Sequence, residues 1–170
     1  MKFVVLSRAG IESFEPLNVM HIIISVSTPN YYYGPEKLPK NGFTLGILRL
    51  SFHERYDIEA IDEASVKYCE KSKKLIEAKE AFSEETAKTV LDFVRNYKDK
   101  EIETIIIHCD AGLARSPAMA AGLANTMFKN EENVFYARRY MEDGLCVFNP
   151  LEWKRHEACF KFINEAYDET

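Results

Sequence analysis

The chain has 170 residues, of which 46% are hydrophobic and 29% are charged, and its net charge is −5. This length and balance are typical of one globular domain, and the sequence shows no repeat, low-complexity tract or linker. Residues 1–170 are therefore predicted to form a single domain. The negative charge and the dispersed basic residues argue against a nucleic-acid partner.

The apolar run at residues 3–6 is too short for a signal-peptide core or a membrane span, so we expect a cytoplasmic protein with no membrane partner. Four cysteines lie at positions 69, 109, 146 and 159. They have neither the paired spacing of metal ligands nor the density of a disulfide scaffold. We therefore expect reduced thiols, no metal and no cofactor.

Four short segments rich in Val, Ile or Leu are the predicted strands: residues 3–6, 21–26, 45–50 and 104–108. Between the second and the third lies the run Tyr31-Tyr32-Tyr33. This run is either an aromatic wall for an aryl ring or an ordinary surface turn.

Helical patterns follow the third strand. Residues 57–81 are rich in Glu, Lys and Ala and are predicted to form an exposed helical insertion. The clearest helix spans residues 83–97, where Ser83 can cap the first turn and apolar residues recur at three- and four-residue spacing. Further helices are predicted at residues 118–128, at 130–141 and from Asn149 onward. The pattern predicts an α/β three-layer sandwich, with a central, mostly parallel sheet of four to five strands flanked by helices.

The most informative segment joins the fourth strand to the next helix and reads Cys109-Asp110-Ala111-Gly112-Leu113-Ala114-Arg115-Ser116. A loop at this junction can turn its backbone N–H groups inward and, with the helix dipole, form a concave anion site. Gly112 suits a backbone angle that other residues resist. Arg115 offers a planar fork for two phosphate oxygens. The segment is therefore predicted to bind a tetrahedral dianion through Arg115 and inward-facing backbone amides.

The cysteine at the mouth of this loop is the predicted nucleophile. The same electric field favours the thiolate of Cys109 over its thiol, and a thiolate beside bound phosphate can attack phosphorus. Ser116 is predicted to donate a hydrogen bond to the sulfur or to help it leave, and His108 to brace the loop backbone. A competing interpretation is a buried structural cysteine followed by an ordinary turn.

The pattern His108-Cys109-x5-Arg115-Ser116 resembles the signature of the cysteine-dependent protein tyrosine and dual-specificity phosphatases. It most resembles their small dual-specificity-like branch in bacteria and phages. The resemblance implies a phosphatase-like fold and hydrolysis of phosphomonoesters through a phosphocysteine on Cys109. It also implies that Arg115 and the amides of residues 110–114 hold the phosphate, without a metal. The expected substrate is a phosphotyrosine-containing protein or a small aryl phosphate.

A general acid must protonate the leaving oxygen, and the related phosphatases usually supply an aspartate from a loop after an earlier strand. They tend to show a Phe-His-Asp or Phe-Asp-Asp element, whereas this chain reads Phe52-His53-Glu54-Arg55-Tyr56-Asp57. Asp57 is our candidate for the acid, with Glu54 and Asp62 as alternatives. All three can also be interpreted as ordinary surface carboxylates.

Two other functions stay open at this point. A catalytically weak phosphate- or phosphopeptide-binding module of the same fold would bind through Arg115 without turnover. A rhodanese-like sulfurtransferase would instead form a persulfide on the loop cysteine from thiosulfate, although the ending Arg115-Ser116-Pro117 suits phosphate better.

Overall fold

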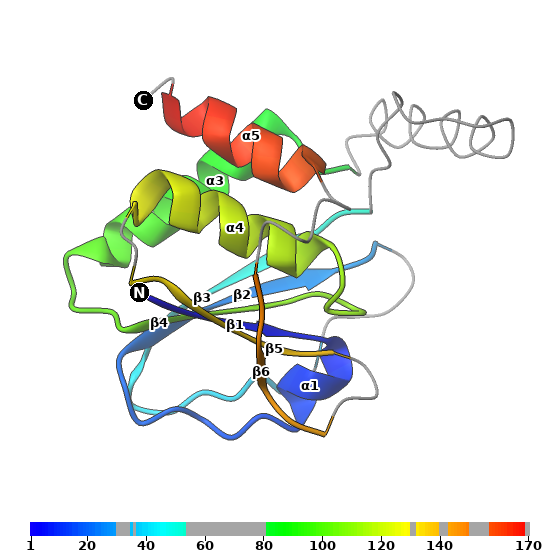
Figure 1. The fold of residues 1–170 in the computed structure, drawn as a ribbon, viewed down its shortest axis with the longest axis vertical. Coiled ribbons are helices and arrows are strands. Elements are labelled where there is room, and N and C mark those ends of the chain that lie inside the picture. The colour runs from blue at the N-terminus through cyan, green and yellow to red at the C-terminus, as the bar shows by residue number, and fades with distance from the viewer. Residues whose placement is uncertain are drawn as a thin grey trace, which may run out of the picture.

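The computed structural model describes residues 1–29, 35, 37–53, 81–129, 132–139, 143–149 and 157–168. Its centre is one six-stranded sheet with the strand order β3-β2-β4-β1-β5-β6 (Figure 1). The strands are β1 (Lys2–Leu6), β2 (His21–Ser27), β3 (Thr44–Ser51), β4 (Thr104–His108), β5 (Val134–Arg138) and β6 (Cys146–Val147). Strands β1 to β5 pair in parallel, and β6 pairs antiparallel with β5.

Helices cover both faces of this sheet. The described helices are α1 (Arg8–Glu12), α3 (Glu84–Lys98), α4 (Arg115–Met127) and α5 (Glu157–Asp168). Helices α3, α4 and α5 lie on one face, and the short α1 lies on the other (Figure 1). The predicted α/β fold with a mostly parallel central sheet is confirmed, with six strands in place of four to five.

The core lies on both sides of β4, all five residues of which are buried. Ile105 and Ile107 belong to the larger cluster beneath α3, α4 and α5, whereas Ile106 belongs to a smaller cluster with Ile11 of α1. This explains the uninterrupted apolar run in the sequence, because a central parallel strand is buried on both faces.

Helix α3 has the cap and the apolar face that were predicted for residues 83–97. The Ser83 side chain accepts a hydrogen bond from the Thr86 amide at 3.2 Å, and Val90, Leu91 and Val94 are buried. Helix α5 likewise buries Cys159 and Ile163.

One predicted element was wrong. Residues 130–141 were predicted as a helix, but Val134–Arg138 forms strand β5. Its alternating burial places Phe135 and Ala137 in the core, and pairing with β1 supplies its main-chain hydrogen bonds.

The helix predicted at residues 118–128 is present, and it spans Arg115–Met127. Arg115 is therefore the first residue of the helix.

Three predictions fall on residues outside those that the structure describes: the run Tyr31-Tyr32-Tyr33, residues 57–80 of the insertion, and the helix start after Asn149. Ala81, predicted as the end of the insertion, forms an isolated bridge with His53.

Candidate active site

Cys109 lies at the edge of the sheet where the parallel strands end. It follows β4 directly, and its backbone amide donates a hydrogen bond to the carbonyl of Leu6, the last residue of β1, at 3.2 Å. Its side chain is 2% exposed. Ligands of open α/β sheets bind at this carboxyl edge, so the fold places the cysteine where a ligand is expected.

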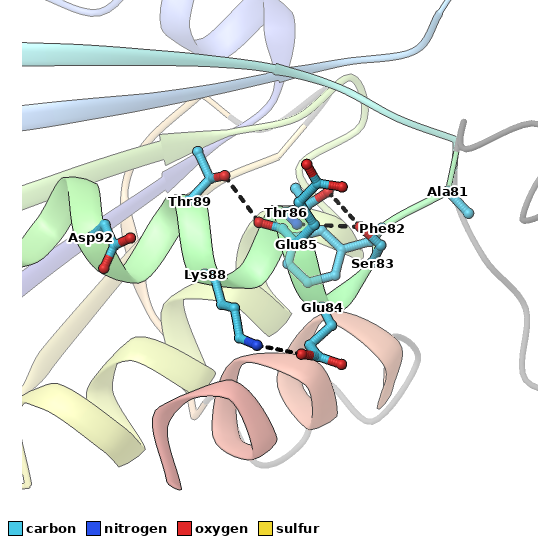
Figure 2. Close-up of a pocket in the computed structure, with 9 residues that line it drawn as sticks. All are labelled: Ala81, Phe82, Ser83, Glu84, Glu85, Thr86, Lys88, Thr89 and Asp92. Atoms are coloured by element: carbon cyan, nitrogen blue, oxygen red, sulfur yellow. Dashed lines mark hydrogen bonds and ion pairs between the residues drawn. The ribbon is translucent and has the colours of Figure 1, made fainter. Parts of the chain in front are cut away.

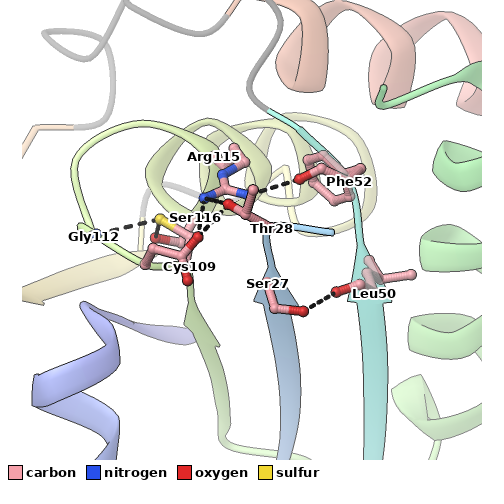
Figure 3. Close-up of polar contacts among 9 residues, drawn as sticks. Ser27, Thr28, Leu50, Phe52, Cys109, Gly112, Arg115 and Ser116 are labelled. Carbon is pink, nitrogen blue, oxygen red and sulfur yellow. Dashed lines mark hydrogen bonds and ion pairs between the residues drawn. The ribbon is translucent and has the colours of Figure 1, made fainter. Parts of the chain in front are cut away.

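Two polar groups contact the sulfur. The backbone amide of Gly112 donates to Cys109 Sγ at 3.3 Å, and Ser116 Oγ lies 3.1 Å from the same atom (Figure 3). Both can donate to a sulfur that carries negative charge. Two such donors at one sulfur are compatible with a nucleophilic cysteine.

Gly112 is required by the shape of the loop. Its φ angle is +69°, and a Cβ at this position would lie 2.7 Å from the backbone nitrogen of Ser7. A larger residue would strain the backbone and collide with the segment after β1. The loop is thus pressed against β1 with its Gly112 amide directed at the sulfur.

Arg115, the first residue of α4, is 5% exposed and is held by three acceptors. Its Nη1 donates to the carbonyl oxygen of Phe52 at 2.7 Å, and its Nη2 donates to Thr28 Oγ1 at 3.1 Å and to Asp110 Oδ2 at 2.6 Å (Figure 3). Thr28 and Phe52 come directly after β2 and β3. The guanidinium is therefore fixed by the ends of two neighbouring strands and by the loop itself.

Asp110 places a carboxylate inside this cluster. Its Oδ2 also accepts a hydrogen bond from Thr28 Oγ1 at 2.5 Å. Burial raises the pKa of the Asp110 carboxyl, but hydrogen bonds from Thr28 and Arg115 and the charge of Arg115 outweigh burial, so the pKa lies below its usual value. Asp110 is therefore ionised at neutral pH.

His108 supports the site from the other face of the sheet. Its Nε2 lies 2.7 Å from Ser25 Oγ of β2. Burial lowers the pKa of His108 to about 4, so the ring is neutral at pH 7. Consecutive strand residues point to opposite faces, so His108 is directed away from the side on which Cys109 packs.

The N-terminus of α4 is uncapped. Its N-cap residue, Ala114, makes no side-chain capping hydrogen bond, and the first turn, every residue of which is described, has no acidic residue. The first backbone N–H groups of a helix have no partner within the helix, so they are free to meet a bound anion.

The structure brings the predicted residues Cys109 and Ser116 together, and it shows two partners of Arg115 that the sequence did not predict. Thr28 and Phe52 were not predicted, although both follow predicted strands whose carboxyl ends share one edge of a parallel sheet. The candidate acid Asp57 and its alternatives Glu54 and Asp62 lie outside the described residues and stay predictions.

A hollow of about 680 Å³ lies beside the start of α3 (Figure 2). Its lining includes the carboxylates of Glu84, Glu85 and Asp92 and one lysine, Lys88, which is paired with Glu84. This excess of negative charge does not suit a phosphate. Across the described part of the chain, no three His, Cys, Asp or Glu side chains gather as ligands for a metal ion.

Comparison with known protein families, with curated proteins and with solved structures gave no match. Within the described ranges, no helix combines the length and the apolar character that crossing a membrane requires. Function is therefore inferred from the geometry of the site.

Proposed function

We propose that this chain is a phosphomonoester hydrolase of the protein tyrosine or dual-specificity type, acting through a phosphocysteine on Cys109. One observation supports this most strongly. The Cys109 sulfur, the Gly112 amide that donates to it and the Asp110 carboxylate that binds Arg115 belong to one loop, which leads into the uncapped N-terminus of α4. A nucleophile, a strong cation and a helix N-terminus brought together by one short loop are what transfer of a phosphoryl group requires.

In the binding step, Arg115 and the amides of residues 110–114 hold the phosphate oxygens. The nearly complete burial of Arg115 strengthens its attraction for the phosphate, because charge interactions are less screened away from water. The dipole of α4 adds to the same attraction. Phosphorus then lies in front of the sulfur.

In the first chemical step, the thiolate attacks phosphorus, so that an S–P bond forms while the P–O bond to the leaving group breaks. The leaving oxygen takes a proton from the general acid, for which Asp57 is our candidate and Glu54 and Asp62 are the alternatives. In the second step, water attacks phosphorus and gives a proton to the carboxylate that the general acid has become, the S–P bond breaks, and phosphate and the thiolate are released. The Ser116 hydroxyl, 3.1 Å from the sulfur, stabilises the departing thiolate.

The substrate class is a phosphotyrosine-containing protein or a small aryl phosphate. A phenolate leaves more easily than an alkoxide, so such substrates depend less on the general acid. The competing proposal is a phosphopeptide-binding module with the same site and no turnover.

The test is hydrolysis of para-nitrophenyl phosphate by the parent and by Cys109→Ser. We expect turnover to fall by roughly three orders of magnitude or more in the variant, because the nucleophile is lost. The matched control is Cys146→Ser, which changes an exposed cysteine in β6 and should leave turnover unchanged.

Binding of inorganic phosphate separates the two proposals. Phosphate binding by a parent without turnover would identify a binding module, whereas turnover that persists in Cys109→Ser would refute the phosphocysteine mechanism. Release of sulfite from thiosulfate, with no hydrolysis of the aryl phosphate, would indicate a sulfurtransferase.

A further inference from the structure

We propose that Asp110 occupies Arg115 as an internal anion, and that the phosphate of the substrate must displace this carboxylate in order to bind. The inference rests on the proposed function and deepens it. It makes Asp110 a residue that sets how tightly the site holds phosphate.

The contacts of Arg115 show which of its hydrogen-bond donors the Asp110 carboxylate occupies. A guanidinium offers parallel N–H pairs along the Nε/Nη2 edge and along the Nη1/Nη2 edge, and a phosphate bound by two oxygens uses one such pair. Nη2 belongs to both edges. In this site Nη2 donates to Asp110 Oδ2 at 2.6 Å and to Thr28 Oγ1 at 3.1 Å, so the nitrogen that both edges share is already engaged.

Asp110 can leave without disturbing the loop. The Asp110 side chain is 38% exposed, whereas that of Arg115 is 6% exposed, so the carboxylate has an open path to water and the guanidinium does not. The backbone of Asp110 stays fixed, because its carbonyl oxygen accepts a hydrogen bond from the Arg8 amide at 3.0 Å.

Arg115 does not depend on Asp110 for its position. Its Nη1 is held by the Phe52 carbonyl at 2.7 Å, and its guanidinium carbon lies 5.8 Å from the centre of the Phe52 ring. These neutral partners remain when the carboxylate turns away. The remaining role of the Asp110 carboxylate is to neutralise the charge of Arg115 while no phosphate is bound.

Thr28 holds the carboxylate in place. Its hydroxyl donates to Asp110 Oδ2 and accepts from Arg115 Nη2, which closes a triangle of three hydrogen bonds. A phosphate that enters must break the Asp110 side of this triangle and also bear repulsion from the carboxylate. Removing the charge of Asp110 should therefore favour phosphate.

The test is the affinity for inorganic phosphate, measured by titration calorimetry, of the parent and of Asp110→Asn. We expect binding to tighten by about tenfold, which is the equivalent of one charge-assisted hydrogen bond. Phosphate should also raise the Tm of the variant more than that of the parent, because at a given phosphate concentration a tighter ligand stabilises the folded state more.

Asp92→Asn is the matched control. It removes the same charge and breaks an exposed ion pair with Arg95 on α3, in which the two side chains are 70% and 35% exposed. Phosphate affinity should stay unchanged in this variant, which shows that the effect of Asp110→Asn is local rather than a consequence of net charge.

Asp110→Ala is a second test variant. It is needed because the side-chain amide of the Asp110→Asn variant can retain hydrogen bonds to Arg115 and Thr28. If both Asp110 variants give the circular dichroism spectrum of the folded protein and bind phosphate no more tightly than the parent does, this inference is overturned. If the parent also hydrolyses para-nitrophenyl phosphate, the proposed function survives that failure. Tighter phosphate binding in variants of a parent without turnover would support the internal anion and reject the hydrolase.

Discussion

The N-termini of α3 and α4 are built in opposite ways. Helix α3 is capped by Ser83, whose hydroxyl accepts from the Thr86 amide, and its first turn carries Glu84 and Glu85. Helix α4 begins after Ala114, which has no capping side chain, and its first turn has no acidic residue. Both helices pack on the same face of the sheet (Figure 1).

The proposed anion site requires this difference. The Thr86 amide of α3 is satisfied by the Ser83 cap, whereas α4 has no side-chain cap, so its first donors can meet an external oxyanion. Unpaired backbone donors lower stability, so their loop must be held by other contacts. In α4 that support is long-range, through the hydrogen bonds from the Cys109 amide to Leu6 and from the Arg8 amide to Asp110.

The largest expected effect concerns His108, which is buried at the end of β4, just before the loop. The pKa of His108 is about 4 in the folded protein and 6.5 in an unfolded chain, so the unfolded chain binds more protons between these values. Stability should therefore fall as the pH drops from 6.5 to 4, by about 3 kcal/mol from this group.

Urea unfolding of the parent and of His108→Gln between pH 7 and 4 measures this loss. The variant cannot take up that proton, so its stability should decline less over the same range. Parallel pH profiles for the two proteins would show that His108 is not buried in its neutral form.

A smaller effect is expected when α4 is given the kind of cap that α3 has. In Ala114→Asp, the new carboxylate should accept from the amides of the first turn and compete with phosphate. We expect the affinity for inorganic phosphate to fall by about tenfold, the equivalent of one charge-assisted hydrogen bond. Titration calorimetry measures the change, and an unchanged affinity would mean that these amides do not face the ligand.

Ser83→Ala is the counterpart of this substitution on α3 and gives the smallest effect. Loss of the cap should lower the free energy of unfolding by about 1 kcal/mol. Phosphate affinity should stay the same, because Ser83 caps α3, whereas the proposed phosphate site lies at the start of α4.

Local patterns in the sequence predicted the elements whose ends are set by neighbouring residues. The cap and the periodicity of α3 and the apolar run of β4 both lead to structures that are present. Strand β5 was predicted as a helix because Asn130, Glu131 and Glu132 look like a helix start. Pairing with β1, more than a hundred residues earlier in the chain, decides the outcome, and tertiary pairing of this kind overrides local propensity.

The residues of the site likewise divide into those that are close in sequence and those that are distant. Cys109, Gly112, Arg115 and Ser116 lie within eight consecutive positions, so their spacing was visible in the sequence. The contacts of Arg115 with Thr28 and Phe52 join positions 87 and 63 residues apart. The Asp110 side chain was missed for a different reason, because the sequence indicated a role for its amide and gave no sign that its carboxylate would turn to the arginine.

Mass spectrometry of the protein quenched with denaturant during hydrolysis of para-nitrophenyl phosphate tests the central claim most directly. If the Cys109 thiolate is the nucleophile, the peptide that contains Cys109 will carry one phosphoryl group, and the same peptide of Cys109→Ser will carry none. A phosphoryl group on another residue, with hydrolysis unaffected by Cys109→Ser, would contradict the account.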